Sequence, residues 1–153
     1  MIFDLVIQAN DNGVYLPLWG TCLGHELIHT CARRANDTLG DFDGDPYYTR
    51  KLMFTPSARE SRMFADEDGG FAKEITKSMN RNQLVVFSHS FGVSPTMYAK
   101  SAQLSSFFKP LAISRDRKNK EFVAIAEALY YPIYGCQFHP EKNVFEWLIT
   151  LPI

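Results

Sequence analysis

A cysteine between two glycines is the first group in this sequence that could do chemistry. Cys22 stands in Gly20-Thr-Cys-Leu-Gly24, after an apolar run over 14–19 and before a helical pattern that begins at Leu23. A sharp strand-to-helix turn presents a nucleophile at a helix N-terminus, where N–H groups and the helix dipole favour a thiolate. Small residues on both sides would avoid collision with the neighbouring strand or helix. A glycine-bounded turn around a buried cysteine is the alternative reading of this short pattern.

A histidine and a glutamate two residues apart could assist such a nucleophile. His139-Pro-Glu141 follows a strand predicted over 133–138. In an extended chain, residues i and i+2 project to the same side. Glu141 could therefore hold one ring nitrogen of His139 while the other nitrogen meets the Cys22 sulfur. The three residues together predict a nucleophile, a base and an orienting group, whereas the histidine and glutamate alone would be read as a surface pair.

A possible zinc motif overlaps the cysteine turn. His25-Glu-Leu-Ile-His29 matches H-E-x-x-H, whose two histidines lie one helical turn apart and can bind zinc. The first glutamate downstream is Glu60, which would have to complete the site from a distant loop. Zinc hydrolysis is kept as an alternative, but we predict neither a metal nor another cofactor. The aspartates of 41–45 have the wrong glycine position for a calcium loop and predict a solvated loop.

Composition is typical of one globular domain spanning 1–153. Of the 153 residues, 46% are hydrophobic, 14% aromatic and 22% charged, which argues against a disordered tail or a charged coiled coil. The formal net charge is -1, so no basic surface for nucleic acid is expected. No apolar run approaches the roughly 18 residues of a membrane span. We therefore expect a small-molecule substrate, and neither nucleic acid nor a membrane as partner.

Hydrophobic periodicity predicts a mixed α/β domain that would position these groups. Helices are predicted over 1–10, 23–34, 70–79 and 101–108. Strands are predicted over 14–19, 49–54, 61–64, 83–87, 111–114, 122–128 and 133–138, with a polar loop over 36–46. The charged segment 115–120 is predicted to turn two of the strands into a hairpin.

Four segments together resemble class I glutamine amidotransferase-like proteins, and among them the γ-glutamyl hydrolases. The segments are Leu16-Pro-Leu-Trp-Gly-Thr-Cys-Leu-Gly24, Ser61-Arg-Met-Phe64, His89-Ser-Phe-Gly-Val-Ser-Pro95 and Tyr131-Pro-Ile-Tyr-Gly-Cys-Gln-Phe-His-Pro-Glu-Lys-Asn-Val-Phe-Glu-Trp147. The resemblance covers essentially the whole chain. It implies a three-layer, doubly wound α/β sheet of the flavodoxin-like type.

The resemblance also implies an activity, the cleavage of γ-glutamyl amide bonds in poly-γ-glutamyl folates or γ-glutamyl peptides. Cys22 would attack the γ-amide carbonyl and form a thioester, with His139 as base and then acid, and Glu141 orienting His139. The N–H of Leu23 would be one oxyanion donor. Such an enzyme would be a cysteine hydrolase that uses no metal.

Three further positions follow from the same resemblance. Glu26 and His89 correspond to residues that face substrate. Glu60 stands where relatives often carry a histidine, just before the Ser-Arg-Met-Phe segment. Relatives are often secreted, lysosomal or vacuolar, while this sequence itself indicates no compartment.

The family fold normally begins with several β-α units before the cysteine strand, including a loop that supplies a second oxyanion N–H. Only 21 residues precede Cys22 here, so we expect a partial sheet with its first β-α units missing, truncated at both ends. Missing strands would expose an apolar sheet edge. The alternative function is then an inactive remnant that acts as an interaction module, with self-association or a homodimer through that edge.

Overall fold

The computed structural model of the protein describes residues 1–65 and 70–142. The helices of these ranges are α1 (Ile2–Asp11), α2 (Leu23–Arg33), the 3-10 helix η1 (Pro56–Glu60), α3 (Phe71–Arg81), α4 (Pro95–Lys100) and α5 (Ala102–Phe107). The strands are β1 (Leu18–Thr21), β2 (Gly40–Arg50), β3 (Met53–Phe54), β4 (Val85–Gly92), β5 (Phe108–Arg115), β6 (Glu121–Ala128) and β7 (Ile133–Cys136). The predicted mixed α/β architecture is confirmed. None of the described helices is long and apolar enough to cross a membrane.

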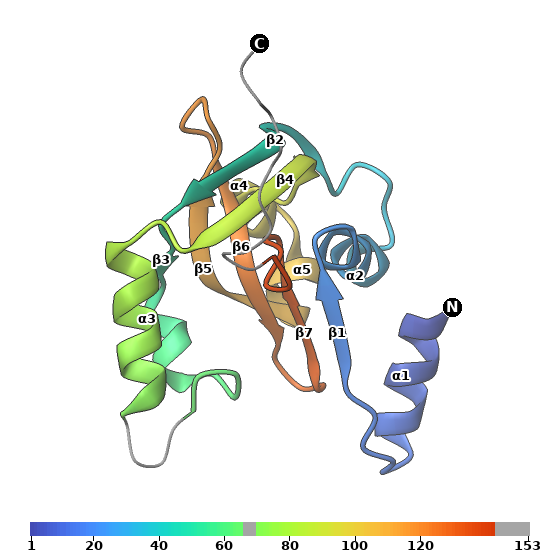
Figure 1. The fold of residues 1–153 in the computed structure, drawn as a ribbon. Helices are drawn as coiled ribbons and strands as arrows, with labels where there is room; N and C mark the ends of the chain where they lie inside the picture. The colour runs from blue at the N-terminus through green and yellow to red at the C-terminus, as the bar shows by residue number, and fades with distance from the viewer. Residues whose placement is uncertain (66–69, 143–153) are drawn as a thin grey trace.

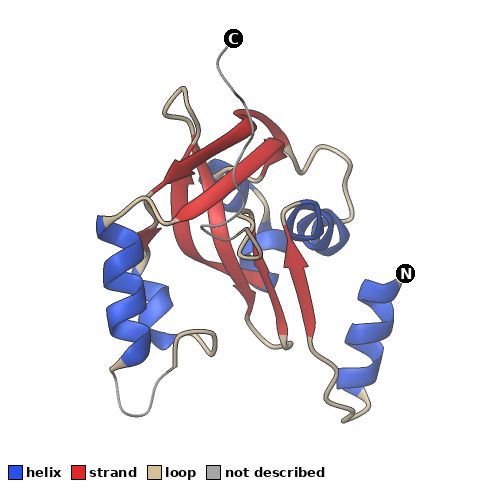
Figure 2. Ribbon diagram, in the orientation of Figure 1, coloured by secondary structure: helices blue, strands red, loops and turns tan. Residues whose placement is uncertain are grey.

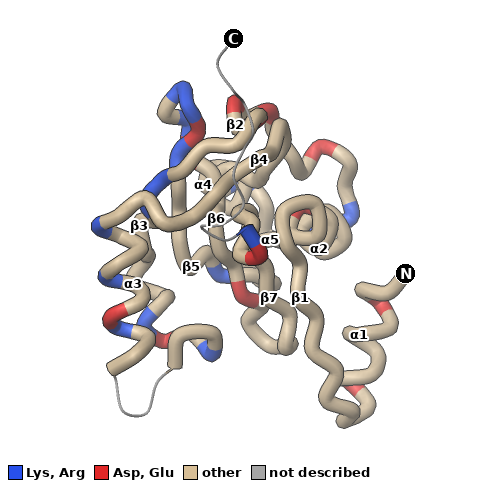
Figure 3. Tube along the Cα trace, viewed as in Figure 1, with Lys and Arg blue, Asp and Glu red and all other residues tan. Residues whose placement is uncertain are grey.

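The central layer is a five-stranded sheet in the order β1-β7-β6-β5-β3 (Figure 1). β1 pairs with β7 in parallel, and the remaining neighbours pair antiparallel. The predicted hairpin between β5 and β6 is present, with Arg115 opposite Glu121. Within the described residues β1 has a strand on one side only, and it carries no charged residue (Figure 3).

One face of this sheet is covered by the two-stranded antiparallel ribbon of β2 and β4, with α3 beside it (Figure 2). Aromatic side chains fill this interface: the ring of Phe87 lies 5.0 Å from that of Phe122 and 6.1 Å from that of Phe138. The other face is covered by α1, α2, α4 and α5, which share a second core with β5, β6 and β7. The sheet therefore lies between two layers, and β1 runs along its edge beside α2.

The polar loop predicted over 36–46 is present over 36–39, but the prediction is wrong from Gly40 onward, where β2 begins. Its aspartates are satisfied by groups distant in the sequence: the Asp43 amide donates to Asp116 at 2.9 Å, and the Asp43 carboxylate lies 3.1 Å from Arg117. Phe42 is buried between these acidic residues. A strand rich in Asp and Gly is thus stabilised by the β5–β6 hairpin turn.

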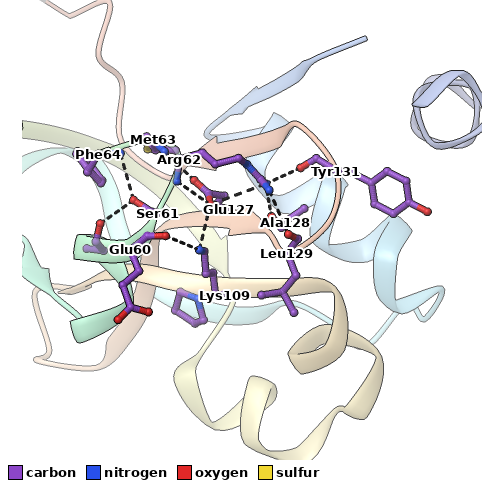
Figure 4. Close-up of polar contacts among 12 residues, drawn as sticks. Glu60, Ser61, Arg62, Met63, Phe64, Lys109, Glu127, Ala128, Leu129 and Tyr131 are labelled. Atoms are coloured by element: carbon purple, nitrogen blue, oxygen red, sulfur yellow. Dashed lines mark hydrogen bonds and ion pairs between the residues drawn. The ribbon is translucent and has the colours of Figure 1, made fainter. Parts of the chain in front are cut away.

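The strand predicted over 61–64 is also wrong. This segment is a bend, and its backbone N–H groups bind a side chain instead of a neighbouring strand (Figure 4). Arg62 N and Met63 N donate to the Glu127 carboxylate at 3.1 and 2.8 Å. Glu127 is fully buried on β6 and also pairs with Lys109 at 3.2 Å.

Candidate active site

Cys22 occupies the sharp turn between β1 and α2. Its φ of 50° and ψ of -107° lie in a region that is strained for a residue with a side chain, as at a nucleophile elbow. The Cys22 amide donates to Cys136 O at 2.8 Å, which ties the turn to the end of β7. A Cβ added to Gly20 would lie 2.5 Å from Gly24 O, so this position requires glycine. A Cβ at Gly24 would meet nothing within 4 Å, and the expectation that both glycines are needed is wrong for Gly24.

The Cys22 thiol is half-buried among polar groups. Its sulfur lies 3.6 Å from Ser88 O and 3.8 Å from Gln137 Nε2. Burial raises the pKa of the thiol above its ordinary value, and the Glu26 carboxylate raises it further; the Leu23 N–H and the Gln137 amide act in the opposite direction. The Leu23 N–H at the helix N-terminus thus lowers the pKa of the thiol, but it does not outweigh burial and Glu26.

His139 and Glu141 lie together directly after β7. His139 Nδ1 and Glu141 Oε1 are 2.6 Å apart, so the predicted pair is present, although a turn at 140–141 brings the two side chains together rather than an extended chain. The hydrogen bond with His139 holds the pKa of the Glu141 carboxyl below its ordinary value. The His139 backbone N–H donates to Val86 O at 2.9 Å, which fixes the segment against β4.

One edge of β4 holds both halves of the predicted triad. The carbonyl of Ser88 meets the Cys22 sulfur, and the carbonyl of Val86 accepts from the His139 amide. Carbonyls two residues apart on a strand lie about 7 Å from each other and point the same way. In the described part of the chain no hydrogen bond joins the Cys22 sulfur to the His139 ring, and what the two residues share is contact with this edge of β4.

Glu26 is buried on the first turn of α2, one turn beyond Cys22. Its Oε1 accepts a hydrogen bond from Gln137 Nε2 at 2.9 Å. Burial raises the pKa of the Glu26 carboxyl, and the Gln137 amide opposes that rise. The same Gln137 amide thus approaches both the Glu26 carboxylate and the Cys22 sulfur, while the contact of Glu26 with substrate stays a prediction.

His89 lies on β4 next to Ser88, but its ring is buried among the aromatic rings of the ribbon core, 4.7 Å from that of Phe122. Its Nδ1 lies 2.6 Å from Phe91 O, and its Nε2 has no hydrogen-bond partner among the described residues. Burial lowers the pKa of this histidine. No hydrogen bond links His89 to Cys22 in the described chain, and its role toward substrate stays a prediction.

Glu60 lies at the end of η1 with an exposed side chain. Its backbone carbonyl accepts from Lys109 Nζ at 3.3 Å, on the side of the molecule that holds Glu127 (Figure 4). The structure thus connects Glu60 to the Glu127 network, and no hydrogen bond brings it to Cys22 among the residues described.

The two histidines of the H-E-x-x-H motif face the helical core. His25 Nε2 lies 3.2 Å from Val123 O, while His29 bonds His25 O at 2.7 Å and Tyr98 Oη at 2.5 Å. Within residues 1–65 and 70–142, no group of three or more His, Cys, Asp or Glu side chains could hold a metal ion. These histidines are therefore structural, and the motif does not assemble a zinc site in the described chain.

Comparison with known proteins identifies the family of this chain. Residues 6–146 match the family described as glutamine amidotransferase class-I. The chain belongs to the class I glutamine amidotransferase family. It is 35% identical over 147 residues to γ-glutamyl hydrolase B of Dictyostelium discoideum, which covers 96% of this chain and 41% of that protein. It is 34% identical to γ-glutamyl hydrolase 1 of Arabidopsis thaliana, and the match covers 95% of this chain and 41% of that protein. It is also 34% identical to human γ-glutamyl hydrolase, with 96% of this chain and 44% of that protein covered.

This class I glutamine amidotransferase chain thus spans about two-fifths of the length of these relatives. Part of the last segment that carries the resemblance, 143–147, lies outside the described residues.

Gln137 is the residue of the site that the sequence reasoning missed. It lies two residues before His139, but residues 137–138 are bends and 140–141 form a turn, so the i, i+2 rule for an extended chain does not apply to this segment. Gln137 is fully buried, whereas the Glu141 side chain is exposed. Local spacing could not single out Gln137, because its partner Glu26 lies 111 positions earlier in the chain.

Proposed function

We propose that this chain carries the catalytic residues of a cysteine hydrolase that cleaves γ-glutamyl amide bonds, in poly-γ-glutamyl folates or γ-glutamyl peptides. The observation that carries the proposal is the shared edge of β4, which holds the strained Cys22 turn and the His139–Glu141 pair next to each other. The similarity to γ-glutamyl hydrolases supports the choice of bond. A secreted, lysosomal or vacuolar location belongs to the same proposal, and fractionation of producing cells tests it.

In the proposed reaction the Cys22 sulfur attacks the γ-carbonyl carbon, and His139 takes the thiol proton. The Leu23 N–H donates to the oxyanion that forms. His139 then protonates the leaving amine, the C–N bond breaks, and a γ-glutamyl thioester of Cys22 remains. Water attacks the thioester while His139 accepts its proton, and free glutamyl carboxylate and the thiol are released. Glu141 holds Nδ1 of His139 throughout, as in other nucleophile–histidine–acid triads.

Glu26 and His89 are proposed as substrate contacts. The support for Glu26 is its position near the thiol, because the Glu26 carboxylate and the Cys22 sulfur both approach the side-chain amide of Gln137. The support for His89 is its buried Nε2 atom, which has no hydrogen-bond partner in the described chain and could bind a substrate group.

The proposal is tested by incubating the chain with a γ-glutamyl peptide and measuring released glutamate. We expect release that is lost in Cys22→Ala, and a covalent adduct at Cys22 when the reaction is quenched early. Cys31→Ala is the matched control, because Cys31 packs against the second core, on the face of the sheet covered by the helices. Turnover that survives Cys22→Ala would exclude the proposed nucleophile.

A second candidate is an interaction module without catalysis, which a cluster of exposed apolar side chains favours. They surround the edge strand β1: Val14, Tyr15, Leu16, Trp19, Leu23 and Leu27. Such a patch is typical of a surface that another chain covers, and a second copy is the proposed occupant.

Self-association tests this candidate. A folded chain that releases no glutamate but dimerises with concentration in sedimentation experiments would favour it. Trp19→Lys should then weaken the dimer, while Phe71→Lys, which changes an even more exposed aromatic on α3, should not.

A further inference from the structure

The side chain of Gln137 lies between the two acidic groups of the site. Its Nε2 is 2.9 Å from Glu26 Oε1 and 3.8 Å from the Cys22 sulfur. The residue is fully buried, and its backbone N–H donates to Ala124 O at 2.9 Å, so the amide has little freedom to move. A primary amide has two N–H bonds and can donate one to each neighbour.

The opposite end of this amide is without a partner. Gln137 Oε1 is buried and has no hydrogen bond among the described residues. Rotating the amide by 180° would set this oxygen against the Glu26 carboxylate, which accepts hydrogen bonds and donates none when ionised. A glutamine held only for structure would use both ends of its amide, whereas here the donor end alone is used, toward Cys22 and Glu26.

Two negative charges in one site need such a donor. The proposed reaction requires a thiolate at Cys22, and Glu26 is one helical turn away. Glu141 also disfavours the charge on the thiol, because it raises the pKa of Cys22. The donors on the other side are the Leu23 N–H and the Gln137 amide.

We propose that Gln137 is a positioning residue whose side-chain amide bridges the Glu26 carboxylate and the Cys22 sulfur, so that both can be ionised in the same site. The inference rests on the proposed role of Cys22. It concerns the charge of the sulfur, however, and can be tested without turnover.

The test is the rate of Cys22 alkylation by iodoacetamide as a function of pH, with the modified peptide identified by mass spectrometry. Gln137→Met keeps the length of the side chain and removes both N–H donors. We expect the pH midpoint of alkylation to rise by about one unit, which makes the reaction about tenfold slower at a fixed pH below the midpoint. Glu26→Gln should lower the midpoint. Gln8→Met, an exposed glutamine on α1, is the matched control and should leave it unchanged.

The double variant distinguishes a bridge from simple packing. With Glu26→Gln in place, Gln137→Met should shift the midpoint by half as much or less, because one of the two charges is gone. A folded Gln137→Met protein with the wild-type midpoint, or an equal shift in both backgrounds, would overturn the proposal. If Gln137→Met does not fold, Gln137→Asn gives the same reading, because its amide is one methylene too short to reach both groups. Failure of glutamate release with the expected midpoints would reject the proposed function and leave the bridge standing.

Discussion

His139 Nδ1 lies 2.6 Å from Glu141 Oε1, two residues further along the chain. Because this hydrogen bond keeps the pKa of Glu141 below its ordinary value of 4.5, the carboxylate is ionised throughout the neutral range. Glu141→Gln keeps an acceptor for Nδ1 but removes the charge that stabilises the imidazolium formed during attack. We expect kcat for glutamate release to fall by about 10²–10⁴ with little change in KM.

Glu74→Gln is the control for this experiment, since Glu74 is an exposed partner of Lys77 on α3. Its kcat should equal that of the wild type. A Glu141→Gln enzyme with wild-type kcat would show that the pair is a surface contact without a part in catalysis.

The two glycines of the cysteine turn should respond oppositely to alanine. In Gly20→Ala the new Cβ would lie 2.5 Å from Gly24 O, and since this contact is with backbone, the turn must shift. We expect the free energy of unfolding to fall by about 1–3 kcal/mol. Gly24→Ala meets nothing within 4 Å and lies in α2, so it should be neutral or stabilising by up to about 1 kcal/mol. Urea denaturation compares the three proteins, and equal losses in both variants would contradict this geometry.

The part of this site that local sequence could predict is the part made by local geometry. The turn at Cys22 and the pairing of His139 with Glu141 depend on neighbours within a few residues, and both are present. Residues 40–46 were missed because Asp and Gly favour loops locally, while the groups that stabilise Asp43 in a strand come from Asp116 and Arg117. Residues 61–64 show the opposite error, since a strand was predicted where the structure has a bend.

Long-range partners also explain the other misses. The backbone amides of Arg62 and Met63 bind Glu127, a residue more than sixty positions away that no periodicity connects to them. The parallel pairing of β1 with β7 brings Cys22 to Cys136 across the whole length of the chain. Gln137 reaches Glu26 only because these two strands are neighbours.

Removing the Glu127 carboxylate should be among the most damaging changes far from Cys22. It is fully buried, pairs with Lys109 at 3.2 Å and accepts from two backbone amides (Figure 4). Glu127→Leu would leave the Lys109 ammonium and both amides without their acceptor, and we expect a loss of about 3–5 kcal/mol in the free energy of unfolding. The control is Glu121→Leu, which breaks an exposed ion pair with Arg115 and should cost about 1 kcal/mol or less. Similar losses in the two variants would mean that Glu127 does not organise the 61–64 bend.

The buried histidines of α2 should make stability fall as the pH is lowered. Burial lowers the pKa of His29 from 6.5 to about 4, and it lowers that of His25 in the same direction. Below pH 6.5 the unfolded chain therefore binds protons that the folded chain does not. The stability is fully present above pH 6.5 and is lost progressively as the pH falls toward 4, by at most about 3 kcal/mol for His29. Urea denaturation at pH 7.5 and pH 5 should show this loss of stability. In His29→Gln the loss between the two pH values should be smaller, and the part that remains comes from His25. A His29→Gln protein whose stability falls as steeply as that of the wild type over the same interval would contradict the assignment.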